Sequence, residues 1–103
     1  MNRILLVVTV GLLGGIAVQA AAQTAIKPAI VYGMGGRFDK SFNEGVGIGA
    51  DKFKAETGIA AAEFEPQNET QFEQAHRRFA QRGQDPIIGV GFSHAVALEK
   101  VAK

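Results

Sequence analysis

Apolar and polar positions follow two alternating patterns along most of the chain. Short apolar runs, each bounded by proline, glycine or charged residues, indicate buried strands at residues 30–32, 59–64 and 85–92. After each run the apolar residues recur at helical spacing, over residues 41–57, 68–82 and 93–103. The pattern therefore predicts three strand–helix units in succession.

The first predicted helix has a start signal and a stop signal. Ser41, with Glu44 three residues later, forms a capping box, and Gly58 stands where a left-handed residue ends many helices. One buried stripe is expected along the helix, made of Phe42, Val46, Ala50 and Phe53. Glycines 45, 47 and 49 weaken the helix, each by about 1 kcal/mol relative to alanine, so we expect close packing against the sheet to explain them.

The second and third predicted helices are amphipathic. In the second, Phe72, Ala75 and Phe79 form the apolar face, and His76 is expected on the polar face. In the third, the apolar stripe consists of Ala95, Leu98, Val101 and Ala102.

Strand–helix units with short connections predict an α/β fold with a parallel sheet and right-handed crossovers. The second strand should lie on one side of the first and the third on the other, in the order 2-1-3. A ligand crevice is expected at the carboxyl ends of strands one and three, where residues 34–43 and 91–94 should meet. A complete domain of this kind needs further strands, so the sequence predicts an incomplete first part of a lobe.

The amino terminus reads as a secretory signal. Asn2-Arg3 precedes an uncharged apolar run, Ile4–Val18, and the small residues of "QAAAQTA" follow, which predicts a signal peptide over residues 1–22 and a mature chain over 23–103. Without Arg3 the chain carries equal numbers of basic and acidic residues, which does not favour a nucleic-acid partner. The sequence has no cysteine for a disulfide or a lipid anchor, so the stability of an exported chain must come from packing alone.

The stretch "YGMGGRFDKSFNEG", residues 32–45, follows the first strand and lies at the predicted crevice. Its glycines begin like a dinucleotide-binding loop, but Phe38 stands where the third glycine belongs, and no Gly-Lys-Ser or Gly-Lys-Thr triplet follows as in a P-loop. Glu63 or Glu65 could supply the acidic residue of a dinucleotide site. A small exported nucleotide-binding domain or enzyme that uses the Gly33–Gly36 loop is therefore the alternative reading.

Asp39 and Asn43 are the candidate binding residues of this stretch. Both lie at the start of a rigid helix, and a carboxylate with an amide suits the polar edge of a small neutral ligand. The structural alternative is that both bond to the backbone of their own turn. Phe38 is either a stacking face or a loop anchor. His76 and His94 lack metal-ligand spacing, and no nucleophile with an adjacent base can be assembled, so we expect no metal, no cofactor and no catalysis.

Two motifs carry a family resemblance. "GGRFDKSFNEG" together with "RRFAQRGQDPIIGVGF" resembles the basic membrane protein (PnrA-like) family of substrate-binding proteins for ABC importers, over nearly all of residues 27–103. The first motif is similar to the family's segment after strand one. The second is similar to its segment leading into strand three.

The resemblance implies a type I periplasmic-binding-protein fold, in which two α/β lobes close on a ligand that is delivered to an inner-membrane ABC permease. Characterised members of the family bind purine nucleosides. The resemblance implies that Asp39 and Asn43 contact the base, while Phe42 and the Gly91-Phe92 turn shape the wall of the first lobe. Many members carry a lipid-anchored cysteine that this sequence lacks, which implies a soluble periplasmic protein instead. The second lobe of the family is missing from this sequence. The sequence is therefore expected to be a fragment of a two-lobe receptor or a truncated product without function.

Overall fold

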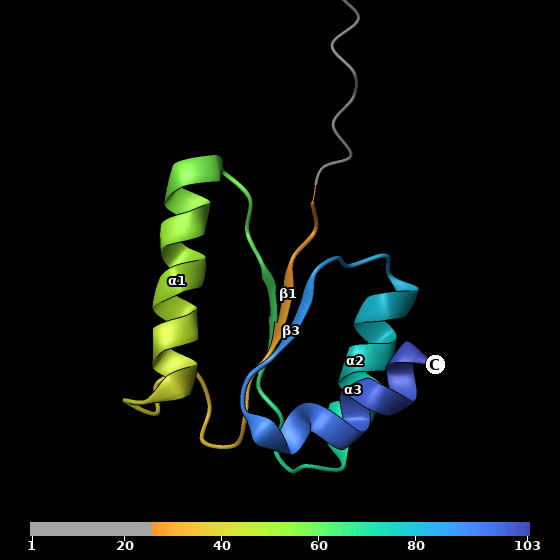
Figure 1. Cartoon of the computed structure of the whole chain (residues 1–103). Helices are drawn as coiled ribbons and strands as arrows, with labels where there is room; N and C mark the ends of the chain where they lie inside the picture. Colours follow the sequence, from red (N-terminus) through yellow and green to blue (C-terminus); the bar gives the residue numbers. More distant parts are fainter. Residues whose placement is uncertain (1–25) are drawn as a thin grey trace, which may run out of the picture.

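The described part of the chain, residues 26–103 of a computed structural model, places three parallel strands between two layers of helices (Figure 1). The predicted signal peptide lies outside these residues. The elements, in chain order, are β1 (Ala29–Val31), α1 (Phe42–Thr57), β2 (Ala62–Phe64), α2 (Gln71–Gln81), β3 (Ile87–Gly89), the 3-10 turn η1 (Phe92–His94) and α3 (Ala95–Ala102).

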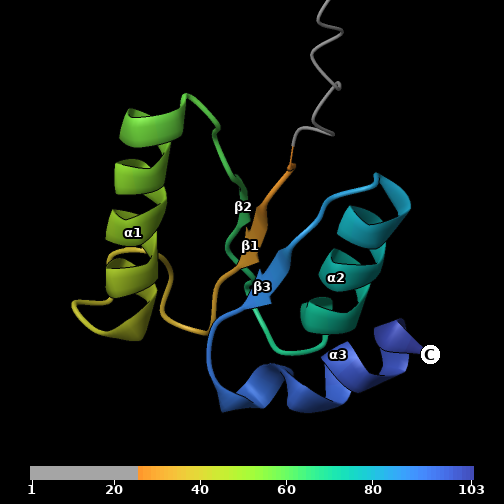
Figure 2. The same cartoon turned by 45° about the horizontal axis from the view of Figure 1, so that its top comes forward.

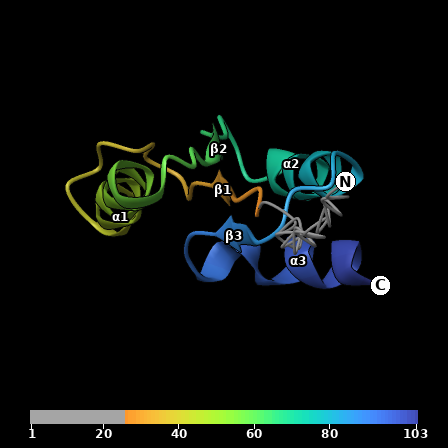
Figure 3. The same cartoon turned by 90° about the horizontal axis from the view of Figure 1, so that it is seen from above.

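The sheet has the predicted order β2-β1-β3, and both pairings are parallel. Val31 lies opposite Phe64 on one side and Gly89 on the other. Viewed from above, α1 lies on one side of the sheet while α2 and α3 lie together on the other (Figure 3). This arrangement confirms the predicted α/β class and the partial, doubly wound lobe.

The alternating side chains of β1 and its extension divide the core in two. Ala29 and Val31 pack with Ala75 and Phe79 of α2, whereas Ile30 and Tyr32 pack with Val90 and with residues of α1. All four residues of Ala29–Tyr32 are buried. Burial on both faces is why this central strand is a continuous apolar run and not an alternating one.

Helix α1 departs from the prediction at its first turn. Phe42 is 80% exposed, so the buried stripe begins one turn later, at Val46. Ser41 is the N-cap residue but its side chain makes no capping bond, because Asp39 bonds to the free N–H groups instead. The capping-box prediction is therefore wrong. The C-cap prediction is confirmed, since Gly58 is left-handed with a φ of 76°.

The glycines of α1 are explained differently from the prediction. A Cβ on Gly47 would lie 2.8 Å from Nε of Arg37, so an arginine side chain and not the sheet requires this glycine. A Cβ on Gly45 or on Gly49 would meet no other atom within 4 Å.

Helices α2 and α3 also differ from the prediction in which residues they bury. Phe72, Ala75 and Phe79 are buried along α2 as predicted, but His76 is also fully buried and does not lie on the polar face. In α3 the buried residue is Ala97, with Leu98 and Val101 half-buried beside it, whereas Ala95 and Ala102 are exposed. The third strand is shorter than predicted and follows a cis Asp85–Pro86 peptide bond.

Candidate functional site

The loop after β1 and the turn after β3 meet at the carboxyl edge of the sheet, as the topology predicts (Figure 2). The backbone N–H of Val90 donates to the carbonyl of Val31 over 3.0 Å. Gly33 approaches the same turn so closely that a Cβ on it would lie 2.7 Å from the Val90 carbonyl oxygen. A glycine is therefore needed at position 33 for contact between two backbones.

Asn43 fastens the loop from inside. Its side chain is 2% exposed, and its Oδ1 accepts the N–H of Gly33 at 2.9 Å. Its Nδ2 donates to the carbonyls of Gly33 at 3.0 Å and Gly36 at 2.9 Å, with Met34 further away at 3.4 Å. The amide thus spans the glycine turn, and all of these partners are backbone groups of the loop.

Asp39 caps α1. Its carboxylate accepts the backbone N–H groups of Ser41 at 2.8 Å, Glu44 at 3.1 Å and Asn43 at 3.3 Å. Desolvation by itself would raise the pKa of Asp39, but these N–H donors outweigh it and hold the pKa below its ordinary value. Asp39 is therefore a stable anion at the amino end of α1, where the helix dipole favours negative charge.

Arg37 links the loop to β2 and to α1. Its guanidinium forms two bonds to Glu63, at 2.7 and 2.9 Å, and also bonds to Asp51 and to the carbonyl of Gly47. The backbone N–H of Arg37 donates to Glu65. The Tyr32 hydroxyl donates to the same Glu63 carboxylate, and burial together with this bond raises the pKa of Tyr32. The guanidinium of Arg37 is thus bonded to Glu63, Asp51 and the Gly47 carbonyl.

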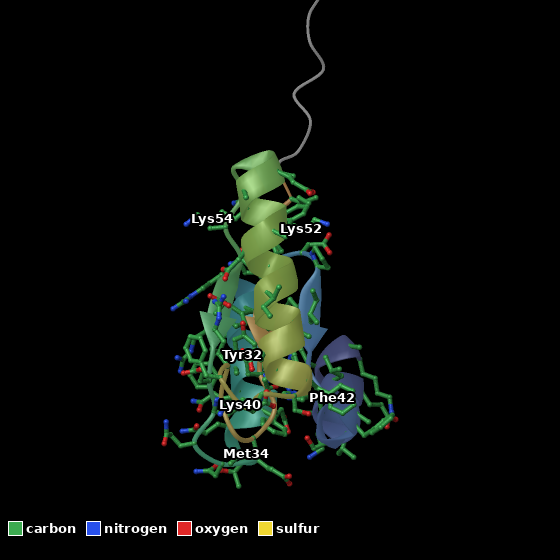
Figure 4. All side chains as sticks on the ribbon, turned by 90° about the vertical axis from the view of Figure 1, so that its left-hand side faces the viewer. Tyr32, Met34, Lys40, Phe42, Lys52 and Lys54 are labelled. Carbon is green, nitrogen blue, oxygen red and sulfur yellow. The ribbon has the colours of Figure 1, made fainter. Side chains whose placement is uncertain are left out.

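Large apolar side chains stand exposed along this edge. Phe92 is 99% exposed, Phe42 80% and Phe38 79%. Phe92 directly follows Gly91, whose φ of 101° produces the turn, and Phe42 begins α1 (Figure 4). The Arg37 guanidinium lies 5.8 Å from the centre of the Phe38 ring.

The predicted site residues thus divide into two groups. Asp39 and Asn43 bond to the backbone of their own loop, which is the structural alternative for both, while Phe42, Gly91 and Phe92 lie on the exposed edge. A cavity of about 560 Å³ opens at the carboxyl end of β2, and its wall includes Arg37, Phe38 and Glu63.

The residues that sequence reasoning missed are two buried histidines. His76 and His94 are fully buried and lie 2.9 Å apart at their ring nitrogens. Helical periodicity would have shown that position 76 adjoins the buried positions 72, 75 and 79, but the identity of the residue argued against it.

Within residues 26–103 no group of three or more histidine, cysteine or carboxylate side chains is arranged to bind a metal ion. No helix in this range has the length and apolar character needed to cross a membrane.

Proteins of known structure that resemble this chain are solute-binding proteins of ABC transporters. The chain is similar to a solute-binding protein of an ABC transporter system from Aeropyrum pernix K1, with a TM-score of 0.69 and 34% identity over 76% of this chain and 21% of that one. A second ABC transporter solute-binding protein, from Conexibacter woesei DSM 14684, gives a TM-score of 0.66 and 32% identity over 76% of this chain and 26% of its own.

The chain is also 29% identical to an uncharacterised lipoprotein of Pyrococcus abyssi, over 99% of this chain and 26% of that protein. No family model matches the sequence. The chain therefore has the fold of a segment of ABC transporter solute-binding proteins, and it spans about a quarter of the length of the proteins it matches.

Proposed function

We propose that this chain forms the first-lobe part of an exported receptor of the basic membrane protein family, which binds a purine nucleoside or a similar small ring compound for an ABC permease. The observation that carries this proposal is the exposed aromatic edge. Phe42 and Phe92 stand almost free of protein contacts at the carboxyl end of the sheet, where open α/β sheets bind their ligands.

An exposed phenylalanine at the carboxyl edge of a sheet can stack against a flat, uncharged ring of a ligand. A single exposed apolar residue is common on protein surfaces, but several on adjoining loops indicate a binding surface. Stacking of a base on an aromatic side chain contributes about 1–3 kcal/mol. The first step in the proposed mechanism is therefore capture of the ring against Phe42 and Phe92, with closure of a second lobe over the ligand.

The rigidity of the loop supports this role. Asn43 fixes the glycine turn from beneath, and Gly91 sets the direction of the turn that carries Phe92. We propose that Asn43 contributes by bracing the loop that faces the base. Asp39 caps the helix with three of its acceptor positions filled by backbone N–H groups, and a carboxylate has about four, so Asp39 can also accept one N–H from a base.

The bonding of the loop also argues against the alternative, a phosphate-binding enzyme. A phosphate loop offers free backbone N–H groups and a free cation. Here the N–H groups of Gly33 and Arg37 donate to Asn43 and Glu65, and the Arg37 guanidinium is bonded to Glu63 and Asp51. We therefore infer a receptor and not an enzyme.

The proposal predicts the effect of removing each exposed ring. In the full-length protein, Phe42→Ala and Phe92→Ala should each weaken the binding of adenosine, guanosine or inosine by about 1–3 kcal/mol, the range for base stacking, as measured by titration calorimetry. Ile48→Ala is the matched control, because Ile48 is 62% exposed on α1 but lies more than a turn beyond the site. Normal nucleoside affinity in both phenylalanine variants would contradict the proposed site.

A further inference from the structure

The two buried histidines lie directly behind the candidate site. His76 occupies the middle of α2, and His94 is the last residue of η1, two positions after Phe92. Nε2 of His76 lies 2.9 Å from Nδ1 of His94, and Nε2 of His94 lies 3.2 Å from the carbonyl oxygen of Tyr32. The two rings are nearly perpendicular, and His94 is stacked on Phe72 with 3.9 Å between ring centres.

The hydrogen-bond partners determine the tautomers of both neutral rings. A carbonyl oxygen only accepts, so Nε2 of His94 must carry a proton and its Nδ1 must be a free acceptor. The partner nitrogen, Nε2 of His76, must then be the donor. This leaves Nδ1 of His76 as an acceptor, buried and without a hydrogen-bond partner.

Strand β3 makes room for this pair. A Cβ on Gly89 would lie 3.0 Å from Cβ and Cγ of His94 and 3.2 Å from Cε1 of His76. A side chain at position 89 would collide with the two imidazole rings, so Gly89 is needed for them to fit against β3.

The chain of bonds joins three elements. It runs from α2 through His94, at the base of the Gly91-Phe92 turn, to the Tyr32 carbonyl, one residue before the Gly33 loop. We propose that His76 and His94 form a positioning pair, which holds the loop after β1 and the turn after β3 in the arrangement that binds the ligand. Protonation of the pair loosens this arrangement. This inference rests on the proposed function for its effect on the ligand.

Protonation is opposed by the surroundings of the pair. Burial lowers the pKa of His76 to about 4, and the neighbouring His94 adds to the shift. Burial also lowers the pKa of His94, against smaller opposing effects of the Tyr32 carbonyl and of Glu69 ahead of α2. Glu73 of α2 and Lys100 of α3 form an ion pair with each other at 3.4 Å, and β3 contributes only the uncharged Gly89.

An additional proton would be unfavourable on either free ring nitrogen of the pair. On Nδ1 of His76 it becomes a buried donor with no acceptor, and on Nδ1 of His94 it faces the N–H of His76. Because the folded pair has lowered pKa values, its contribution is complete above pH 6.5 and declines as the pH falls toward 4.

The first test needs no ligand. Nitrogen NMR of the full-length protein at pH 7.5 should find both rings protonated at Nε2 and unprotonated at Nδ1. Hydrogen exchange of the Gly33 and Val90 amides, corrected for intrinsic rates, should lose protection by up to about tenfold per pH unit below pH 6.5. The double variant His76→Gln/His94→Gln should lose this pH dependence, because it removes both rings of the pair.

The second test separates positioning from packing. His94→Gln keeps an N–H able to reach the Tyr32 carbonyl, whereas His94→Leu does not, so Leu should lower the amide protection and the adenosine affinity about tenfold more than Gln. Phe79→Leu is the control, because Phe79 is a buried residue of α2, the helix that carries His76, but packs in the cluster of Ala29 and Val31. It should leave the pH dependence of the loop amides intact.

Three outcomes would overturn the inference: a proton on Nδ1 of His76 at pH 7.5, equal loop protection in His94→Leu and wild type, or equal loss in Phe79→Leu. If the exchange results are as expected but no nucleoside binds, the positioning role stands and the proposed function fails.

Discussion

At the scale of single residues, the loop after β1 shows how one side chain can replace several backbone contacts. Asn43 occupies a buried position that an apolar residue would normally take, and bonds to both polar groups of Gly33 and to the carbonyl of Gly36. Removing such an amide leaves buried backbone groups unpaired, and each typically costs about 1–3 kcal/mol.

Asn43→Ala should therefore lower the free energy of unfolding of the full-length protein by about 2–4 kcal/mol, measured by urea denaturation. Asn43→Asp should be at least as destabilising at pH 7, because an ionised carboxylate accepts from Gly33 but cannot donate to the carbonyls. Gln74→Ala, at an exposed position of α2, is the control and should change stability by less than about 0.5 kcal/mol. Equal stability of Asn43→Ala and wild type would contradict the bracing role.

The residue scale is also where sequence reasoning was least complete. Both Ser41 and Asp39 are good capping residues, and which of them bonds to the helix depends on the path of the glycine turn, which no periodicity describes. The burial of His76 depends in the same way on a partner 18 positions away and on the space left by Gly89.

At the scale of secondary-structure elements, the predictions from periodicity were more successful. Strand order, helix order, the apolar face of α2 and the C-cap of α1 follow from apolar spacing and from glycine positions, which depend only on local geometry. There are two exceptions, the apolar stripe of α3, of which Ala95 and Ala102 are exposed, and the first turn of α1. Phe42 fits the helical stripe in sequence, but its side chain is 80% exposed, so nothing within residues 26–103 covers it.

Two glycines of α1 give a matched prediction at this scale. Gly45→Ala should stabilise the protein by about 0.5–1 kcal/mol, because its Cβ meets nothing within 4 Å and alanine is the better helix former. Gly47→Ala should instead destabilise it by about 1–3 kcal/mol, because the methyl group would displace the Arg37 side chain from its bonds to Glu63 and Asp51. Thermal or urea denaturation would measure both changes, and the same sign for both would contradict the role of Arg37.

At the scale of the whole molecule, we propose that the described residues form one edge of a binding site that a two-lobe receptor would complete. The braced loop, the turn after β3 and the histidine pair all lie at the carboxyl edge of one sheet, and the exposed rings face outward from it. On the face covered by α1, an apolar groove of about 350 Å³ lies between the helix and Ile88 of β3. The similarity to ABC transporter solute-binding proteins, of which this chain covers 21% and 26%, is consistent with this role.

The central claim is that the full-length protein binds nucleosides through this edge, and the most direct measurement is its melting temperature in the presence of separate ligands. Adenosine, guanosine or inosine at about 100 times its dissociation constant should add about 2.7 kcal/mol of stability to the folded state and raise the melting temperature accordingly. AMP, ATP and NAD should raise it less, because the loop offers neither a free arginine nor free N–H groups at Gly33 and Arg37. Stabilisation by ATP or NAD alone, with no effect of any nucleoside, would contradict the account.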